Sequence, residues 1–145
     1  MNPEIKERWL TALRSGKYKQ TDGYLNIQRN NPEAVPEGNL RGNGYCCLGV
    51  LCELAVADGV IKKRHSPEGD FFEYGNPEAN DWDYSVLPLS VKDWAGLTDT
   101  NPYINDTFID EDSDSDYPDN WIPISEPNDN GSNFEEIAQM IERDL

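Results

Sequence analysis

The segment at residues 45–57, YCCLGVLCELAVA, limits the folds open to this chain more than any other, because it is apolar almost all the way round. Its length and the glycines on either side favour a buried helix over a strand. Gly59 is the predicted C-terminal stop of this helix. The only charged residue within this segment is Glu53, and Asp58 follows directly after it. A helix without a polar face must be covered on all sides, so we expect it at the centre of the fold.

Two amphipathic helices are predicted near the ends of the sequence. The first spans about residues 3–14, with Asn2 as its N-cap and Pro3 at the first helical position. Its apolar face is formed by Ile5, Trp9, Ala12 and Leu13. The last begins after a capping box made by Ser132 and Glu135. Its apolar face is formed by Phe134, Ile137, Ala138, Ile141 and Leu145.

Short strands and one short helix account for the remaining regular structure. The segments 60–64 and 71–74 flank a turn and predict a hairpin. Further short strands are predicted at 24–28, 104–109 and 121–124. Ser90 is the predicted cap of a short helix that ends before Gly96. Together these elements predict an α+β fold in which three main helices pack on a small, mostly antiparallel sheet.

Length and cysteine content place the chain in a broad class. A chain of 145 residues fits one domain, so we expect a single domain over 1–145 with a long acidic loop region at about 98–131. No apolar run approaches the roughly 18 residues that cross a bilayer, and the start of the chain lacks a secretory signal. Three cysteines in one cluster are not a secreted disulfide framework. We therefore expect a cytoplasmic protein with no membrane partner.

The two halves of the sequence differ in the sign of their charge. The net charge is −16, yet residues 1–65 contain ten Lys or Arg against seven Asp or Glu. Residues 66–145 contain two against twenty-one. The acidic half would repel phosphate, so we expect no direct nucleic-acid binding. The basic half can meet a small anion, and the acidic half could imitate nucleic acid towards a protein partner.

The cysteines and the single histidine carry no clear catalytic or metal-binding pattern. Structural zinc usually takes four ligands in paired spacings, which Cys46, Cys47 and Cys52 do not have. In an apolar helix they are expected to pack as small hydrophobic residues. The alternatives are a metal site and a reactive thiol at Cys46, near the helix N-terminus, where thiol pKa falls. His65 is the only imidazole that could serve as its base, and it is expected on the surface.

The acidic run at 110–116 resembles a calcium-binding loop only at first sight. An EF-hand loop needs glycine at its sixth position and glutamate at its twelfth. Counted from Asp112, those positions hold Tyr117 and Pro123, and the count from Asp110 also fails. We therefore expect a solvated acidic loop, and we expect no metal or other cofactor. Carboxylates for acid–base hydrolysis could be present among so many acids, but no spacing identifies a pair.

Two segments before the apolar helix combine residue types that suit a nucleotide: cations for phosphate, aromatic rings for a base and amides for a base edge. One follows the first helix, and the other is the glycine-rich loop 38–44. That loop leads into a helix N-terminus, where backbone N–H groups favour an anion. The candidate residues are Lys17, Tyr18, Gln20, Arg41, Asn43 and Tyr45. The alternative is a surface loop with ordinary turn residues.

The sequence resembles a family of small proteins encoded by tailed bacteriophages. The resemblance rests on residues 45–55 together with N-P-E-I-K-x-x-W at 2–9, S-G-x-Y-x-Q at 15–20, L-P-x-S-V-x-x-W-A-G-L at 87–97 and N-D-x-G-x-x-F-x-x-I-A-x-x-I-E at 128–142. It implies an origin more than an activity, because these motifs are specific to the family and not to any chemistry. Small non-structural phage proteins often act on the host. Asn128 and Asp129 belong to the last motif and are added as candidate ligand contacts. Their alternative role is turn chemistry before the final helix.

These observations lead to one preferred function and two alternatives. The preferred function is a non-enzymatic phage protein that counters host defence in the infected bacterial cell by sequestering a nucleotide-derived immune signal. One alternative is an acidic inhibitor or DNA mimic that binds a host defence protein. The other is a hydrolase that uses carboxylates and a divalent metal. A homo-oligomer is compatible with the sequence but no feature requires one.

Overall fold

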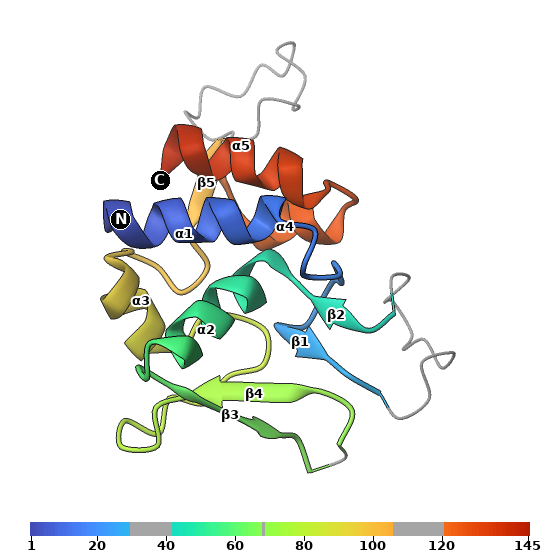
Figure 1. Cartoon of the computed structure of the whole chain (residues 1–145), viewed down its shortest axis with the longest axis vertical. Helices are drawn as coiled ribbons and strands as arrows, with labels where there is room; N and C mark the ends of the chain where they lie inside the picture. Colours follow the sequence, from blue (N-terminus) through green and yellow to red (C-terminus); the bar gives the residue numbers. More distant parts are fainter. Residues whose placement is uncertain (30–41, 68, 106–120) are drawn as a thin grey trace.

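The computed structural model describes residues 1–29, 42–67, 69–105 and 121–145 and has a mixed α+β fold (Figure 1). The helices of these residues are α1 (Pro3–Arg14), α2 (Cys47–Ala57), α3 (Leu89–Ala95), α4 (Ser125–Asp129) and α5 (Phe134–Asp144). The strands are β1 (Asn26–Ile27), β2 (Gly44–Tyr45), β3 (Lys62–His65), β4 (Phe72–Gly75), β5 (Tyr103–Asn105) and β6 (Trp121–Pro123). The predicted fold class is confirmed.

The strands pair as three separate antiparallel ribbons, β1–β2, β3–β4 and β5–β6. One small sheet was expected, and within the described residues the pairing is divided instead because each strand is only two to four residues long. Isolated bridges connect two of the ribbons to their surroundings. Ile27 bridges Phe71, next to β4, and Gln20 bridges Tyr45 in β2. The ribbons β1–β2 and β3–β4 are therefore neighbours, and in Figure 1 β3–β4 lies below α2 while β1–β2 lies to its right.

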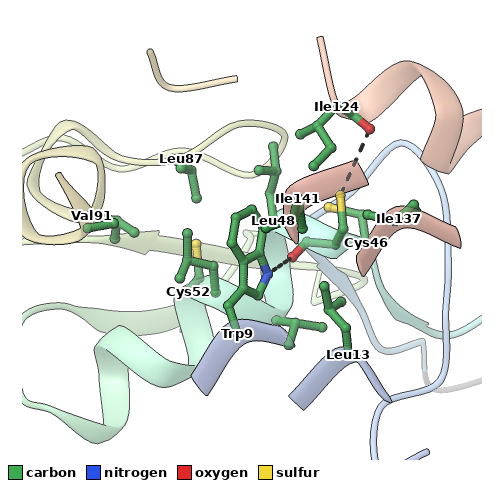
Figure 2. Packing of buried hydrophobic residues seen from close by; sticks show 14 of the residues in the cluster. Trp9, Leu13, Cys46, Leu48, Cys52, Leu87, Val91, Ile124, Ile137 and Ile141 are labelled. Carbon is green, nitrogen blue, oxygen red and sulfur yellow. Dashed lines mark hydrogen bonds between the residues drawn. The ribbon is translucent and has the colours of Figure 1, made fainter. Parts of the chain in front are cut away.

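The apolar helix α2 lies at the centre, between α1 and the β3–β4 ribbon (Figure 1). Most of its residues are inaccessible to solvent. The indole Nε1 of Trp9 in α1 donates to the carbonyl of Cys47, 2.9 Å away, and Figure 2 shows the ring among core side chains from several elements. On the other side, Gly49 meets the backbone of Leu25 so closely that a Cβ atom would lie 1.7 Å from the Leu25 carbonyl oxygen. The central position predicted for this helix is confirmed.

The first and last helices pack along each other (Figure 1). Arg14 of α1 forms ion pairs of 3.0 Å with Glu135 and 2.9 Å with Glu142 of α5. At the other end of α1, Asn2 caps the helix by accepting from the backbone N–H of Glu4 at 2.9 Å. The bounds predicted for α1 are those observed, because an asparagine N-cap followed by proline marks a helix start unambiguously.

Two predicted helix caps are wrong by one or two residues. The capping box of α5 is formed by Asn133 and Glu136 instead of Ser132 and Glu135. Asparagine caps a helix as well as serine does, and each has a glutamate three residues later. The helix α3 begins at Leu89 after Pro88. Ser90 thus lies inside α3, where its backbone N–H donates to Asp81 at 2.7 Å.

Candidate ligand-binding site

Two candidate tyrosines from distant parts of the sequence lie in contact. The backbone N–H of Tyr45 in β2 donates to the carbonyl of Lys19, 2.8 Å away, which fixes the segment after α1 beside β2. This places the ring of Tyr18 edge-on to the ring of Tyr45, with centroids 5.2 Å apart and planes at 89°. Both rings are half-buried. They therefore form an aromatic surface that remains open to solvent on one side.

The only carboxylate inside α2 lies close to these rings. The side chain of Glu53 is 14% exposed, and its Oε1 accepts from the hydroxyl of Tyr74 at 2.7 Å and from the ammonium of Lys63 at 2.9 Å. Within the described part of the chain, no group donates to the second oxygen, Oε2. Both donors come from the β3–β4 ribbon, so the pairing of these two strands positions the carboxylate.

Amide side chains extend the hydrogen-bond network of Glu53 through Tyr74. Asn26 of β1 is buried and donates through Nδ2 to the Tyr74 hydroxyl at 3.0 Å, while Gln28 donates to Asn26 Oδ1 at 3.0 Å. We call the connected residues Tyr18, Asn26, Tyr45, Glu53, Lys63 and Tyr74 the Glu53 cluster.

The tyrosines of the Glu53 cluster remain protonated at neutral pH. Burial raises the pKa of Tyr18, Tyr45 and Tyr74, and the negative charge of Glu53 raises all three further. A protonated hydroxyl is a hydrogen-bond donor as well as an acceptor. The cluster therefore presents neutral hydroxyls, one carboxylate and one ammonium group.

A groove of about 320 Å³ between α1 and α2 adjoins the cluster. It is lined by Glu7, Arg8, Thr11, Ala12, Ser15, Lys17, Tyr18 and Leu54. Arg8 is held at the surface by Asp58 with two hydrogen bonds of 2.8 and 2.9 Å, whereas Lys17 is exposed at the groove. Tyr18 belongs to both features, so the groove and the Glu53 cluster are continuous.

Three other candidate residues hold the fold together. Gln20 donates to Asn128 Oδ1 at 3.0 Å and to the Ser132 carbonyl at 2.8 Å. Asn128 is 0% exposed, and its Oδ1 also accepts from the backbone N–H of Cys47 at 3.2 Å. Asp129 accepts from the backbone N–H of Gly23 at 3.0 Å. These contacts attach α4 to the start of α2 and to the segment before β1.

The glycine-rich loop is only partly described. Asn43 forms a reciprocal pair with Arg29, because its Oδ1 accepts from the Arg29 backbone N–H at 3.0 Å and its Nδ2 donates to the Arg29 carbonyl at 3.4 Å. Arg41 lies outside the described residues. Of the eight candidates, the structure thus brings Lys17, Tyr18 and Tyr45 to the groove and the Glu53 cluster.

The cysteines pack in the core, as predicted. All three are buried. The alternative of a reactive thiol at Cys46 does not hold, because burial raises the pKa of this thiol to about 12 and outweighs the backbone N–H groups of Gly49 and Leu48, which lower it. His65 is exposed, with its ring 4.3 Å from the ring of Phe72. The acidic run 110–116 lies outside the described residues.

Sequence reasoning missed Asn26, Glu53, Lys63 and Tyr74. A signal existed for Glu53, since a lone acid in an otherwise apolar helix must find donors or water. No signal identified its partners, because Tyr74 and Lys63 are 21 and 10 residues away and Asn26 is 48 residues from Tyr74. Only the folded ribbons bring them together.

Comparisons with known proteins give one match. Neither the curated proteins nor the solved structures contain a match to this chain. In the parts that the structure describes, no helix is both long enough and apolar enough to span a bilayer. One family model, described as a domain of unknown function, DUF8296, matches residues 1–145. The chain therefore belongs, over its whole length, to the DUF8296 family.

Proposed function

We propose that this protein is a non-enzymatic binder, made by a tailed bacteriophage, that sequesters a nucleotide-derived signal of host immunity. The observation that carries the proposal is the shared position of Tyr18. This ring lines the groove beside Lys17 and contacts Tyr45, another member of the Glu53 cluster. An aromatic ring and a cation thus lie together at the groove, and the same ring contacts a second tyrosine outside it.

Each part of a nucleotide has a chemical counterpart at this site. The exposed faces of the tyrosines suit a base, because stacking on aromatic rings contributes about 1–3 kcal/mol per base. Lys17 supplies positive charge for a phosphate group, and the hydroxyls of Thr11 and Ser15 line the same groove. Of the Glu53 cluster, Lys63 and Glu53 are the charged side chains with solvent-accessible surface, at 37% and 14%, and they supply polar groups for a base edge.

One set of observations supports binding over catalysis, and another supports a phage origin. The thiols are buried and their pKa values are raised, which makes them poor nucleophiles, and the tyrosine hydroxyls are protonated. The phage origin is supported by the sequence motifs at 2–9, 15–20, 45–55, 87–97 and 128–142, which are distributed from one end of the sequence to the other. Small phage proteins of this kind often act against the host.

A thermal-shift screen tests the proposal. The panel contains cyclic di- and trinucleotides and ADP-ribose derivatives, and each sample is analysed by mass spectrometry afterwards. Saturation at about 100 times the dissociation constant adds about 2.7 kcal/mol to the stability of the folded state, which shifts the melting temperature visibly. A shift with the ligand recovered intact supports sequestration. A shift with an altered ligand identifies an enzyme instead, and no shift with any compound refutes the proposal.

Matched variants locate the site of any ligand that binds. We expect Tyr18→Ala and Lys17→Ala each to weaken binding about tenfold or more, since each removes a stacking or charged contact worth about 1–3 kcal/mol. The controls are Tyr103→Ala, an exposed tyrosine on β5, and Lys92→Ala on α3. Isothermal titration calorimetry gives the affinities. Equal losses in the control variants would show that the ligand binds elsewhere.

A second candidate function has its own supporting observation. Tyr103 and Trp121 are 49% and 45% exposed, and the register of β5 and β6 places them on the same face of that ribbon. Exposed aromatic residues are enriched in protein interfaces, which favours an inhibitor that binds a host protein through this acidic half. Replacing both residues by serine would then abolish retention of that protein in a pull-down from host lysate, whereas a nucleotide sequestering protein would keep its ligand affinity.

A further inference from the structure

We propose that the outer edge of β3 is a docking site for an extended acidic peptide of a partner protein, which adds to the β3–β4 ribbon as a third strand. This edge does not line the groove between α1 and α2, so the proposal is independent of the nucleotide ligand proposed above. It is argued from the hydrogen-bond directions in the ribbon, from the exposure of β3 and from the charge of its side chains.

The pairing of the ribbon fixes which backbone groups of β3 face away from β4. Tyr74, the partner of Lys63 in the register, uses its own N–H and C=O on the opposite side of β4, where they form hydrogen bonds of 2.8 and 2.9 Å with Asp83. Lys63 and Tyr74 are therefore a non-hydrogen-bonded pair, in which the backbone groups of both residues point away from each other. His65 lies two residues further along β3, so its N–H and C=O point outwards as well.

The outward groups of β3 have no partner among the residues that the structure describes. In that part of the chain no backbone or side-chain donor reaches the C=O of Lys63 or His65, and their N–H groups reach no acceptor. The opposite edge of the ribbon is covered, since Asp83 bridges Tyr74 there. All four residues of β3 are exposed, and Figure 1 shows this strand at the lower rim of the molecule. β3 is thus an open sheet edge, to which an extended peptide can add as a strand.

The side chains of β3 specify the charge of the added strand. Residues 62–64 are the only three consecutive cations in the sequence. Lys63 and Arg64 form ion pairs of 2.9 and 3.4 Å but stay 37% and 52% exposed, and Lys62 has no ion pair within the described residues. Opposite charges on neighbouring strands stabilise their pairing, and like charges destabilise it. An acidic strand is therefore the complement of β3.

Two other occupants fit this edge less well. A second copy of β3 would place cations opposite cations, and lysines on a sheet edge act against such self-pairing. A nucleic acid would meet the cations through its phosphates, but phosphate oxygens only accept hydrogen bonds and would leave the outward carbonyls unpaired. A peptide backbone offers both N–H and C=O groups at the spacing of a strand.

Fluorescence anisotropy with labelled probes at one physiological salt concentration tests the proposal. The first probe is an eight-residue peptide that alternates glutamate with threonine. The comparison probes are the same peptide with lysine in place of glutamate, the acidic peptide N-methylated at every residue, and an oligothymidylate of eight nucleotides. We expect the unmodified acidic peptide to bind at least about tenfold more tightly than each of the other three, because only this peptide combines negative charge with backbone N–H groups. Equal affinity for any comparison probe, or no binding of the acidic peptide, would overturn the proposal.

Two substitutions at one position connect the binding to this edge. His65→Pro removes an outward N–H, and an edge strand tolerates proline where the N–H is not used within the sheet. His65→Thr retains the N–H and is the matched control. We expect the proline variant to bind the acidic peptide at least about tenfold more weakly and the threonine variant to change its affinity by less than about threefold. Melting curves establish that both are folded, and the comparison of probes on the wild-type protein decides the proposal if either is not. Equal affinities of the two folded variants would overturn it.

Discussion

At the scale of single residues, the Tyr74 hydroxyl connects the candidate site to the fold. It donates to Glu53 and accepts from Asn26, and the ring is fully buried. A buried polar group that loses its partner costs about 1–3 kcal/mol, more than the net contribution of the hydrogen bond itself. The same atom therefore maintains the geometry of the carboxylate and the stability of the chain.

Removal of this hydroxyl is the prediction that belongs to this scale. We expect Tyr74→Phe to lower the free energy of unfolding by about 1–3 kcal/mol, because Asn26 loses its acceptor and Glu53 loses a donor. Urea denaturation monitored by tryptophan fluorescence measures this difference. Tyr103→Phe, at an exposed position, is the matched control and should change stability by less than about 0.5 kcal/mol. Similar values for both variants would contradict the prediction.

At the scale of elements, the position of α2 is set by a backbone contact at Gly49. A Cβ atom there would lie 1.7 Å from the Leu25 carbonyl oxygen, which belongs to the backbone and cannot rotate away. The helix can approach the segment before β1 this closely only because residue 49 has no side chain. This explains why a glycine is present inside a helix, where it is otherwise unfavourable.

The expected result of Gly49→Ala is a loss of about 3 kcal/mol of stability or more, since α2 and the β1 segment would have to move apart. Thermal and urea unfolding of the purified variant measure it. Gly59→Ala is the control, because residue 59 has a φ of +75° but open space around it. We expect Gly59→Ala to lower stability by only about 1–2 kcal/mol, the cost of placing an alanine in the left-handed backbone conformation. A smaller loss at position 49 than at 59 would show that the contact is not tight.

Asp81 ties the loop after β4 to the start of α3, and its ionisation gives a pH-dependent prediction. Its two oxygens accept from the backbone N–H groups of Asn76 at 2.6 Å and Ser90 at 2.7 Å. Burial acts to raise its pKa, but these hydrogen bonds outweigh burial and lower it. A lowered pKa in the folded state means stability that is present above the ordinary aspartate pKa of about 3.9 and lost as the pH falls through the folded value.

We therefore expect Asp81→Asn to reduce stability at pH 7 by about 1.5–3 kcal/mol and to reduce the dependence of stability on pH below about pH 4. Urea unfolding at a series of pH values tests both effects. Asp93→Asn is the control, since Asp93 is an exposed aspartate on α3 that pairs with Lys92. The role assigned to Asp81 would be refuted if the stability of Asp81→Asn fell below about pH 4 as steeply as that of the wild-type protein.

The elements differ in how well the sequence predicts them. The bounds of α1 and the existence of α2, α5 and the β3–β4 hairpin follow from caps, apolar periodicity and turn residues, all of which are local. The start of α5 was misplaced because Ser132 and Asn133 are equally good caps, and only tertiary contact decides between them. The carbonyl of Ser132 is already used by Gln20, a residue from a different part of the chain.

At the scale of the whole molecule, the candidate site depends on pairings that local patterns do not contain. Lys17, Tyr18 and Tyr45 were identifiable by residue type. The inward position of Asn128 was not, because a polar motif before a helix reads as a surface turn until its hydrogen bonds to Thr21 and Cys47 are known. Glu53 acquires its place at the site only when β3 and β4 pair beneath α2.

The packing of α1 against α5 has a consequence for how the chain is made. Arg14 and Glu135 are 121 residues apart in the sequence, yet they form one ion pair. A ribosome synthesises these residues in order, so α1 emerges long before the helix that covers it. The part of its apolar face that packs on α5 stays uncovered, or under a temporary partner such as a chaperone, until α5 is synthesised, whereas α2, which Trp9 contacts, is made earlier. Folding of this protein is therefore expected to be completed only after α5 has been synthesised.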